Sequence, residues 1–168
     1  MRCVRYIRGM DIRIATEADL DPLLQLINIA FEVERFFKIE DRLDAASLRS
    51  YFEKGSFLVI EEQGNLLAAV YVERAGDRAY LGLLSVDPTQ QKRGLGRRLT
   101  AAAEEFAREM GARFMDLTVV NLRSELPPIY EKLGYQVTGT APFPVEQMPV
   151  TMPCHFICMT KELGHREI

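Results

Sequence analysis

Residues 91–98 place two glycines among four basic side chains, just before an amphipathic sequence. Leu99, Phe106 and Met110 then recur at the spacing of one helical face, so we expect a helix to begin here. A helix start leaves backbone N–H groups unpaired, and Ser, Thr, Asp or Asn caps with nearby acidic residues usually satisfy them. Neither is present in this segment. An anion bound by the bare N–H groups and the basic side chains would account for both features.

Other interpretations of this segment are a solvated basic turn, a nucleotide-binding loop and a dinucleotide-binding loop. A Walker loop requires Gly-Lys followed by Ser or Thr, whereas Gly96 is followed by two arginines and Leu99. The pair Gly94-x-Gly96 follows a strand as in dinucleotide-binding proteins, but Leu99 replaces the third small residue. Asp116, the candidate ribose ligand, falls inside a predicted strand and would face a helix end or solvent. We therefore do not expect a nicotinamide cofactor.

The whole chain has the composition of one ordinary globular domain. It has 168 residues, 48% apolar and 27% charged, with a net charge of −3. A negative net charge argues against general attraction to nucleic acid. No stretch approaches the roughly 18 apolar residues of a membrane span, and the basic N-terminus lacks the apolar run of a signal peptide. We expect a cytoplasmic protein that binds neither nucleic acid nor membranes.

Residues 1–9 are predicted to be an N-terminal extension, with Met10 as the natural start and residues 10–168 as a single domain. The three cysteines are Cys3, Cys154 and Cys158, and the last two are expected on one face of a strand. No second cysteine pair and no histidine at zinc-finger spacing completes a metal site. We expect buried, reduced thiols and no bound metal.

Hydrophobic periodicity and turn residues predict the element order β-α-α-β-β-β-α-β-α-β-β. The first half is expected to contain a strand at 11–15, a helix at 16–31 capped by Thr16, an irregular connection at 32–43, and a helix from Asp44 to Lys54 stopped by Gly55. A hairpin at 56–73, turning at 63–65, and a strand at 78–86 after a turn at 76–77 should follow. The second half is expected to contain a helix from Gly94 to Met110, a strand at 113–120, a helix at 128–133, and strands at 135–139 and 154–162. The last two strands flank a loop with Pro142, Pro144, Pro149 and Pro153. This pattern indicates an α+β domain with one central βαβ unit.

Three motifs resemble those of the GNAT superfamily of acyl-CoA-dependent N-acetyltransferases. The segment Gln91-x-x-Gly94-x-Gly96, after a strand ending in Val86-Asp87-Pro88, is similar to the family's acetyl-CoA signature. Asn121 follows the next strand, and residues 130–135 (YEKLGY) resemble the family's closing Tyr-x-x-x-Gly-aromatic element. The likeness extends from about Met10 to Glu162.

The resemblance implies a mixed, twisted sheet of about seven strands with about four helices. Its two central parallel strands, at 79–86 and 113–120, would splay apart, and the pantetheine arm of acetyl-CoA would enter the gap. Acetyl-CoA is then the co-substrate, and no metal takes part. The residues implied to bind it are Leu84 and Val86 through their backbone, Gln91, Lys92, Arg93, Gly94, Leu95, Gly96, Arg97 and Arg98 around the pyrophosphate, and Asn121 from the opposite side of the arm.

The family reaction is direct attack of a neutral amine on the thioester, without an acyl-enzyme. The resemblance assigns polarisation of the carbonyl to a backbone N–H of the strand at 79–86. It assigns protonation of the leaving thiolate to Tyr130, whose phenol is close in acidity to a thiol. Many relatives carry a glutamate base where this chain has Tyr80. Glu73 or His155 acting through water, or water alone, are the alternatives, so no base is assigned.

Three further side chains are potential nucleophiles. Ser85, Cys154 and Cys158 lack an evident neighbouring base in the sequence, and direct transfer requires none of them. We interpret all three as structural.

Two segments correspond to those that build the acceptor pocket in the family, residues 32–44 and 142–153. The first carries a slight acidic excess, which fits a cationic amine or is simply solvated surface. Its charged residues are Glu32, Glu34, Glu40, Asp41 and Asp44 against Arg35, Lys38 and Arg42, and Phe36, Phe37 and Phe143 would line an apolar wall or belong to the core.

The expected function is therefore an acetyl-CoA-dependent N-acetyltransferase for a small-molecule or peptide primary amine. The alternative is a non-catalytic acyl-CoA-binding or sensing module. The sequence is also compatible with a homodimer.

Overall fold

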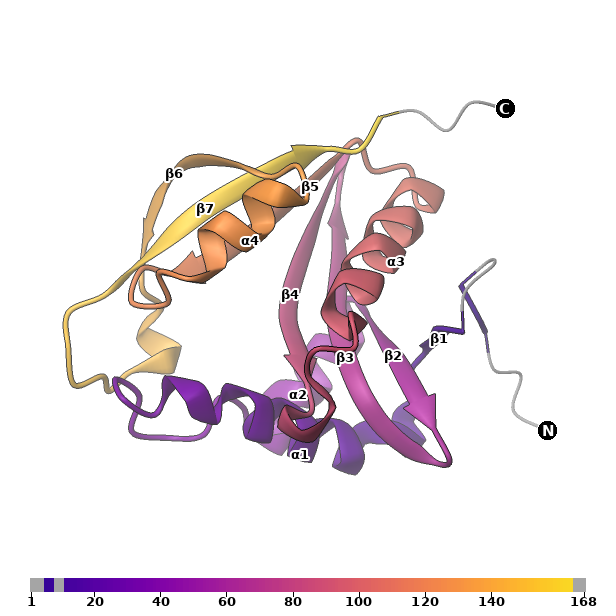
Figure 1. Cartoon of the computed structure of the whole chain (residues 1–168), viewed down its shortest axis with the longest axis horizontal. Coiled ribbons are helices and arrows are strands. Elements are labelled where there is room, and N and C mark those ends of the chain that lie inside the picture. The colour runs from indigo at the N-terminus through magenta and orange to yellow at the C-terminus, as the bar shows by residue number, and fades with distance from the viewer. Residues whose placement is uncertain (1–4, 8–10, 165–168) are drawn as a thin grey trace.

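The computed structural model describes residues 5–7 and 11–164. One seven-stranded sheet, of order β1-β2-β3-β4-β5-β7-β6, organises the domain (Figure 1). Its strands are β1 (Arg13–Ile14), β2 (Ser56–Glu62), β3 (Asn65–Ala75), β4 (Arg78–Val86), β5 (Phe114–Val120), β6 (Gln136–Pro142) and β7 (His155–Glu162). The helices are α1 (Leu20–Ala30), α2 (Ala45–Lys54), α3 (Leu95–Glu109) and α4 (Leu126–Lys132), with 3₁₀ turns η1 (Glu17–Asp19), η2 (Phe31–Glu34), η3 (Pro88–Gln90) and η4 (Val145–Gln147).

This architecture confirms the predicted α+β class, the order of elements and the mixed sheet. The hairpin between β2 and β3 turns through Gln63 and Gly64, both with positive φ (51° and 80°), as the tightest two-residue turns require. Asp44 begins α2 as predicted, its Oδ1 accepting a hydrogen bond of 2.7 Å from the N–H of Ser47. The local turn and cap signals therefore located these boundaries correctly.

Pro142 is the main difference from the predicted boundaries. The sequence predicts Pro142 in the loop before the last strand, but it is the last residue of β6 and pairs with His155. β6 is the edge strand of the sheet, so a residue without an N–H is tolerated there.

The parallel strands β4 and β5 pair only at one end. Their register contains Arg78 opposite Phe114, Ala79 opposite Met115 and Tyr80 opposite Asp116. Beyond these pairs the two strands diverge, as Figure 1 shows. Towards its end β4 keeps its antiparallel partner β3 but has lost β5. This confirms the predicted splay of the two central strands.

A bulge in β4 lies where the two strands separate. The β3–β4 register shifts between Ala69 and Tyr71, and Leu83 takes a left-handed φ of 50°. A bulge adds a residue to one strand and increases its local twist and bend. The bend falls in the part of β4 that has left β5.

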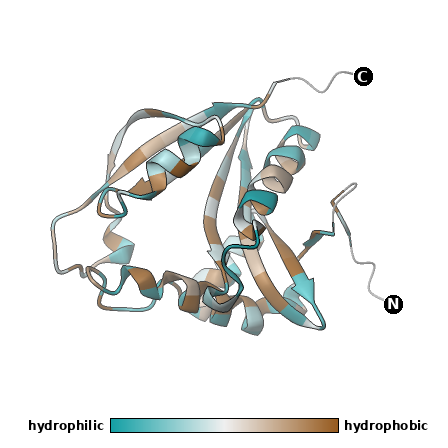
Figure 2. Cartoon of the chain, in the orientation of Figure 1, coloured by the Kyte–Doolittle hydropathy of each residue, from teal (hydrophilic) through white to brown (hydrophobic). Residues whose placement is uncertain are grey.

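Helices cover both faces of the sheet. One cluster of buried residues joins the apolar face of α3 to the strands, through Leu95, Leu99 and Phe106. A second cluster packs α1 and α2 on the other face, including Leu23 and Leu48. Hydrophobic residues are concentrated along the central strands, whereas the turn joining β2 and β3 is hydrophilic (Figure 2).

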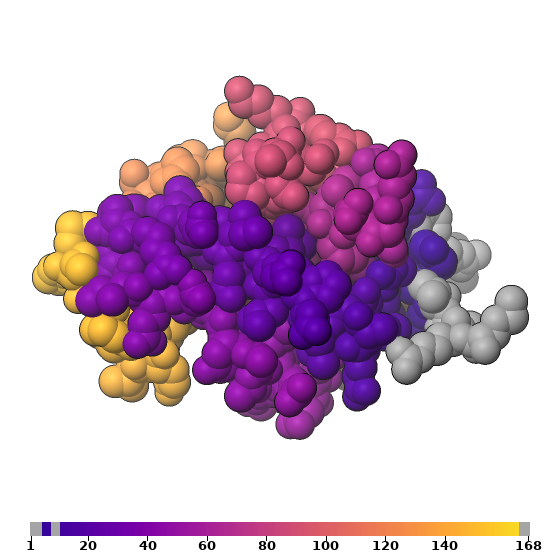
Figure 3. Space-filling model, turned by 90° about the horizontal axis from the view of Figure 1, so that it is seen from below, coloured from indigo at the N-terminus to yellow at the C-terminus, as the bar shows by residue number. Residues whose placement is uncertain are grey.

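A third, smaller cluster joins segments far apart in the sequence. It contains Phe37, Val120 and Phe143, and the rings of Phe37 and Phe143 meet edge to face at 6.4 Å. The N–H of Thr151 also donates to the carbonyl of Phe37 at 2.8 Å. In Figure 3 the segment before β7 accordingly lies against the connection that follows α1. The two segments implied to form the acceptor pocket are therefore neighbours.

The described part of the predicted N-terminal extension, residues 5–7, packs on the domain. Ile7 is buried, and its N–H donates to the carbonyl of Ile12 at 2.7 Å. The rest of that extension, Met10 and Cys3 lie outside the described residues. None of the helices in the described ranges combines the length and apolar character needed to cross a bilayer.

Asp19 provides a test of how stability depends on pH. Its carboxylate accepts hydrogen bonds from Arg13 at 2.8 and 2.9 Å and from the N–H of Thr16 at 2.8 Å. The Arg13 guanidinium in particular holds the pKa of Asp19 below its ordinary value of 3.8. A lowered carboxyl pKa stabilises the fold above the unfolded-state value, and this stabilisation is lost as the pH falls through the folded-state value.

We expect Asp19→Asn to lower the free energy of unfolding by about 2 kcal/mol at neutral pH. The difference from wild type should shrink below about pH 4, where Asp19 of the unfolded chain takes up a proton, and should vanish once the pH falls below the lowered folded-state pKa. Urea denaturation at about pH 7 and about pH 3 measures both values. An equal loss at the two pH values would contradict the proposed role of the charge.

Candidate active site

The loop before α3 presents unpaired backbone N–H groups. Gly94 precedes the helix with φ 74°, and Lys92 has φ 65°, so the backbone alternates in the way that forms anion-binding nests. No side chain caps α3, and the first helical bond runs from the N–H of Arg98 to the carbonyl of Gly94 at 3.0 Å. Among the described residues, the N–H groups of Leu95, Gly96 and Arg97 have no acceptor. The helix start is therefore open to an anion.

A cavity of about 560 Å³ adjoins this loop. It extends from the helix start along the end of β4 to α4. Its lining includes eight residues predicted to bind the cofactor: Leu84, Val86, Gln91, Lys92, Gly94, Leu95, Gly96 and Arg97. The structure thus brings most of the predicted set together around one space, although their binding role stays a prediction.

Gly96 lies in the lining of this cavity and has no side chain, so a ligand can come close to the backbone there. A Cβ at that position would lie 3.8 Å from both Leu84 and Val86, which is ordinary contact. The protein itself therefore leaves room for a side chain at this position, and the glycine keeps that room free for a ligand.

Three residues of the predicted cofactor set lie outside this lining. Arg93 is occupied by Glu62 at 3.0 Å and Gln90 at 2.7 Å, while Arg98 is exposed on α3. Asn121 holds the start of β7, since its Oδ1 accepts from the N–H of His155 at 2.8 Å. The positions of these three residues therefore do not support their predicted roles in binding acetyl-CoA, which stay predictions.

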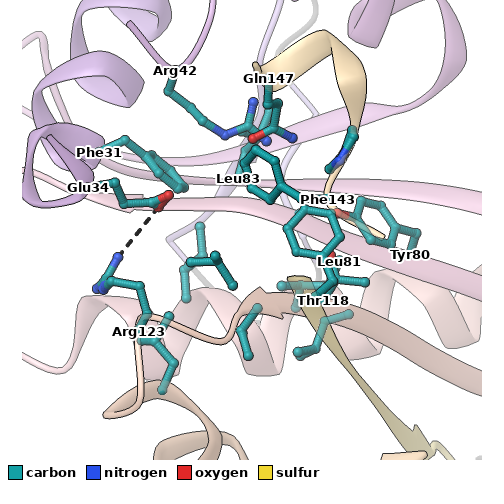
Figure 4. Close-up of a pocket in the computed structure, with 18 of the residues that line it drawn as sticks. Phe31, Glu34, Arg42, Tyr80, Leu81, Leu83, Thr118, Arg123, Phe143 and Gln147 are labelled. Carbon is teal, nitrogen blue, oxygen red and sulfur yellow. Dashed lines mark ion pairs between the residues drawn. The ribbon is translucent and has the colours of Figure 1, made fainter. Parts of the chain in front are cut away.

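A second cavity, of about 310 Å³, lies where β4 and β5 have separated. Residues of both strands, of the connection after α1 and of the loop before β7 contribute to it (Figure 4). Glu34 and Arg123 enter from opposite sides and form an ion pair with an N–O distance of 3.7 Å. Phe143 lines this cavity as well as belonging to the core, whereas Phe36 is exposed and Phe37 is fully buried.

Tyr130 lies at the junction of the two cavities. It lines both of them, together with Leu84 and Leu126. The residue is buried, and its ring packs edge to face on Tyr135 with centroids 5.8 Å apart. Burial raises the pKa of Tyr130 to about 12, so its hydroxyl is protonated across the physiological range. The Tyr130 phenol is therefore neutral, and it holds a proton beside both cavities.

Neither predicted base alternative lines either cavity. The Glu73 carboxylate accepts a hydrogen bond of 2.8 Å from the Tyr71 hydroxyl, and His155 is exposed beyond Asn121. Tyr80 does line the second cavity, but burial raises the pKa of its phenol, so it stays neutral. Glu34, whose pKa is raised by burial, is the one carboxylate in that lining.

The predicted structural interpretation fits Ser85, whose hydroxyl donates to the carbonyl of Leu83 at 2.9 Å. Cys154 and Cys158 are free thiols, but they are half-buried rather than buried, and Cys154 precedes β7. No cluster of three or more metal-ligating side chains occurs within residues 5–7 and 11–164.

Asp116 does not face a helix end. Its side chain is 33% exposed and accepts hydrogen bonds from Arg78 at 2.6 and 2.7 Å and from Thr160 at 2.6 Å, which the sequence did not predict. These contacts join β4, β5 and β7 at the end where the sheet is closed.

Several polar residues of the second cavity were not predicted as a site. Glu34 and Arg42 were noted only as part of a mixed charge run, and Arg123 and Gln147 were not singled out. Local spacing carries no signal for them, because they come together only when four separate segments meet.

A splayed parallel strand pair with an uncapped, glycine-containing helix start beside it defines the GNAT class of fold. The chain belongs to this family, because residues 29–152 match the family model described as an acetyltransferase (GNAT) domain. A mycothiol acetyltransferase from Propionibacterium freudenreichii subsp. shermanii is 26% identical over 140 residues, which is 79% of this chain. The chain spans only 45% of that relative's length.

Two solved structures share the fold across nearly the whole chain. The ribosomal-protein-S18-alanine N-acetyltransferase from Escherichia coli has a TM-score of 0.72 and 19% identity, covering 93% of this chain and 95% of its own. The protein yncA from Salmonella typhimurium, solved with its cofactor acetyl-CoA, has a TM-score of 0.72 and 21% identity, covering 94% and 95%.

Proposed function

We propose that this protein is an acetyl-CoA-dependent N-acetyltransferase that acetylates a primary amine by direct attack on the thioester. The observation that carries the proposal is that Tyr130, Leu84 and Leu126 line two cavities at once. One cavity begins at unpaired helix N–H groups, and the other is bounded by mixed polar and apolar side chains. A donor and an acceptor could therefore meet beside one protonated phenol.

The residues of the first cavity fit acetyl-CoA as co-substrate. The N–H groups of Leu95, Gly96 and Arg97 would bind the diphosphate, with Lys92 and the Arg97 side chain adding positive charge. The end of β4 has no β5 neighbour, so its backbone would pair with the extended arm. The yncA structure, which contains acetyl-CoA, supports this use of the fold.

With Tyr130 as the acid, every bond and proton of the acetyl transfer is accounted for. The neutral amine nitrogen forms a bond to the thioester carbon, and the C–S bond breaks. The Tyr130 hydroxyl protonates the departing sulfur and then regains a proton from solvent. The amine's excess proton leaves to water, because the described lining has no unpaired carboxylate or imidazole to receive it directly.

A non-catalytic acyl-CoA-binding module is the second candidate. It is favoured by Tyr80, a neutral phenol at the position where the family resemblance predicts a glutamate base. Such a module would bind acetyl-CoA but would not transfer its acetyl group to any amine.

We expect acetyl-CoA to bind in a calorimetric titration and free thiol to be released when a panel of primary amines is added. The panel should contain amino acids, polyamines, peptide N-termini and aminoglycosides, with mass spectrometry of the products to identify N-acetylation. Binding without turnover across the panel favours the module. No binding of acetyl-CoA contradicts both candidates.

A further inference from the structure

We propose that the acceptor is a small amine that also carries a carboxylate, as a free amino acid does, and that Arg42 binds this carboxylate. The inference rests on the proposed function and specifies its second substrate. It comes from the charges around the 310 Å³ cavity, which differ from what the sequence composition indicated.

The acidic excess of the segment 32–44 does not reach this cavity. Asp41 pairs with Arg35, and Asp44 caps α2 through Ser47. Of the acidic residues in that segment, Glu34 is the one that lines the cavity. A polycationic acceptor would therefore meet little negative charge here.

Positive charge is in surplus around the cavity instead. Arg123 is matched by two carboxylates, Glu34 at 3.7 Å and Glu125 at 2.5 Å. Lys38, which is 5% exposed, and Arg42 both lie close enough to influence the pKa of Glu34. No carboxylate of the described residues lies within 4.0 Å of either of them. Among the residues that line the cavity itself, two are cationic, Arg42 and Arg123, and one is acidic, Glu34.

Arg42 is the cation left to meet a ligand. Arg42 is a half-buried residue of the cavity lining, and its guanidinium carbon lies 5.5 Å from the centre of the Phe31 ring. Arginine stays charged in proteins, and a partly desolvated charge without a partner is unfavourable. Its planar donors match a carboxylate in a two-bond arrangement, and the amide of Gln147 in the same lining can supply a further donor.

Arg42 and Tyr130 share one small cavity, so an amine that reaches Tyr130 could present its own carboxylate to Arg42. Arg42 belongs to the segment after α1, whereas Tyr130 belongs to α4 on the far side of the gap, and both line this cavity. The cavity is near the lower end of the roughly 300–1,000 Å³ typical of ligand sites, which favours a small molecule. Phe31, Phe143 and Phe156 supply apolar walls for a side chain.

The test uses acceptors that share a side chain but differ in the carboxylate, with kcat/KM expressed per neutral amine because the amine pKa also differs among them. L-leucine is compared with L-leucinamide and 3-methylbutylamine, and L-phenylalanine with its amide and with phenethylamine. We expect wild-type kcat/KM to be at least about tenfold higher for the amino acid in a set that reacts. Arg42→Gln should remove this preference by raising KM for the amino acid, with little change for the neutral twin.

Arg35→Gln is the matched control, because Arg35 lies in the same segment, pairs with Asp41 and does not line this cavity. It should keep the wild-type preference. Neutral twins that equal or exceed the amino acids in wild type would overturn the inference. If no member reacts, calorimetric binding of the same sets to the CoA-bound protein decides, and equal or absent binding overturns it. Acetyl-CoA titrated alone tests the proposed function separately.

Discussion

Tyr130→Phe is expected to lower kcat by about 10²–10⁴-fold on any acceptor that wild type acetylates. The change removes one hydroxyl from a buried side chain that lines both cavities. Without it, the departing sulfur must leave as a thiolate or take its proton from water. The ring and its packing on Tyr135 are retained, so KM for acetyl-CoA should stay within about twofold.

Single-turnover measurement gives the sharpest result, because product release often limits kcat and would mask a slower chemical step. Tyr135→Phe is the matched control, since it loses the same atom from the neighbouring ring without lining either cavity. It should keep the wild-type single-turnover rate within a few-fold, provided that its thermal stability is checked. A wild-type rate for Tyr130→Phe would show that the sulfur obtains its proton elsewhere.

The pH profile is a further constraint on the same assignment. Burial raises the pKa of Tyr130 to about 12, and an acid is effective below its pKa. The wild-type rate should therefore rise as the amine becomes neutral and should not fall again before about pH 10. An alkaline loss of rate near neutrality would point to a different acid.

Local signals in the sequence were sufficient for most of the fold. Two positive-φ positions at Gln63 and Gly64, the cap at Asp44 and the stop at Gly55 depend on residues close to one another in the chain. The same holds for the bare start of α3, where the absence of a capping residue is visible without a structure. Placing these elements in one sheet with splayed central strands required the family resemblance.

Contacts between distant segments could not be predicted in the same way. Asp116 meets Arg78 and Thr160 because β5 lies between β4 and β7, an order that periodicity does not reveal. Arg93 carries a charge suited to phosphate, but the β2–β3 hairpin brings Glu62 to it. In both cases the sequence shows a charged side chain with no evident partner, and the fold supplies that partner.

The charge of the second cavity could not be predicted from the sequence either. The segment 32–44 has more acidic than basic residues, which suggested affinity for a cation. The fold pairs or displaces most of those acids and leaves Arg42 facing the cavity. Net composition therefore does not give the local charge, because pairing and capping decide which groups remain available to a ligand, and from this segment only Glu34 and Arg42 line the cavity.

Gly96→Asp is expected to weaken acetyl-CoA binding by about 100-fold or more. Two charges 4 Å apart interact by about 4 kcal/mol at the effective dielectric of a protein surface, so a carboxylate beside the diphosphate is strongly unfavourable. The new carboxylate would also accept the N–H groups left open at the start of α3. A Cβ fits at this position, and acidic residues stabilise the first turn of a helix. The free energy of unfolding should thus stay equal or rise while binding is lost.

Two control variants separate charge from bulk and from general electrostatics. Gly96→Asn places nearly the same volume in the cavity without charge, so it should cost much less affinity than Gly96→Asp. Ala101→Asp adds a carboxylate to an exposed position of α3 outside the cavity and should leave binding within about twofold. Isothermal titration with acetyl-CoA and urea denaturation measure affinity and stability on the same samples. Wild-type affinity in Gly96→Asp would mean that the diphosphate does not bind at this helix start, and the donor half of the proposed reaction would then have no site.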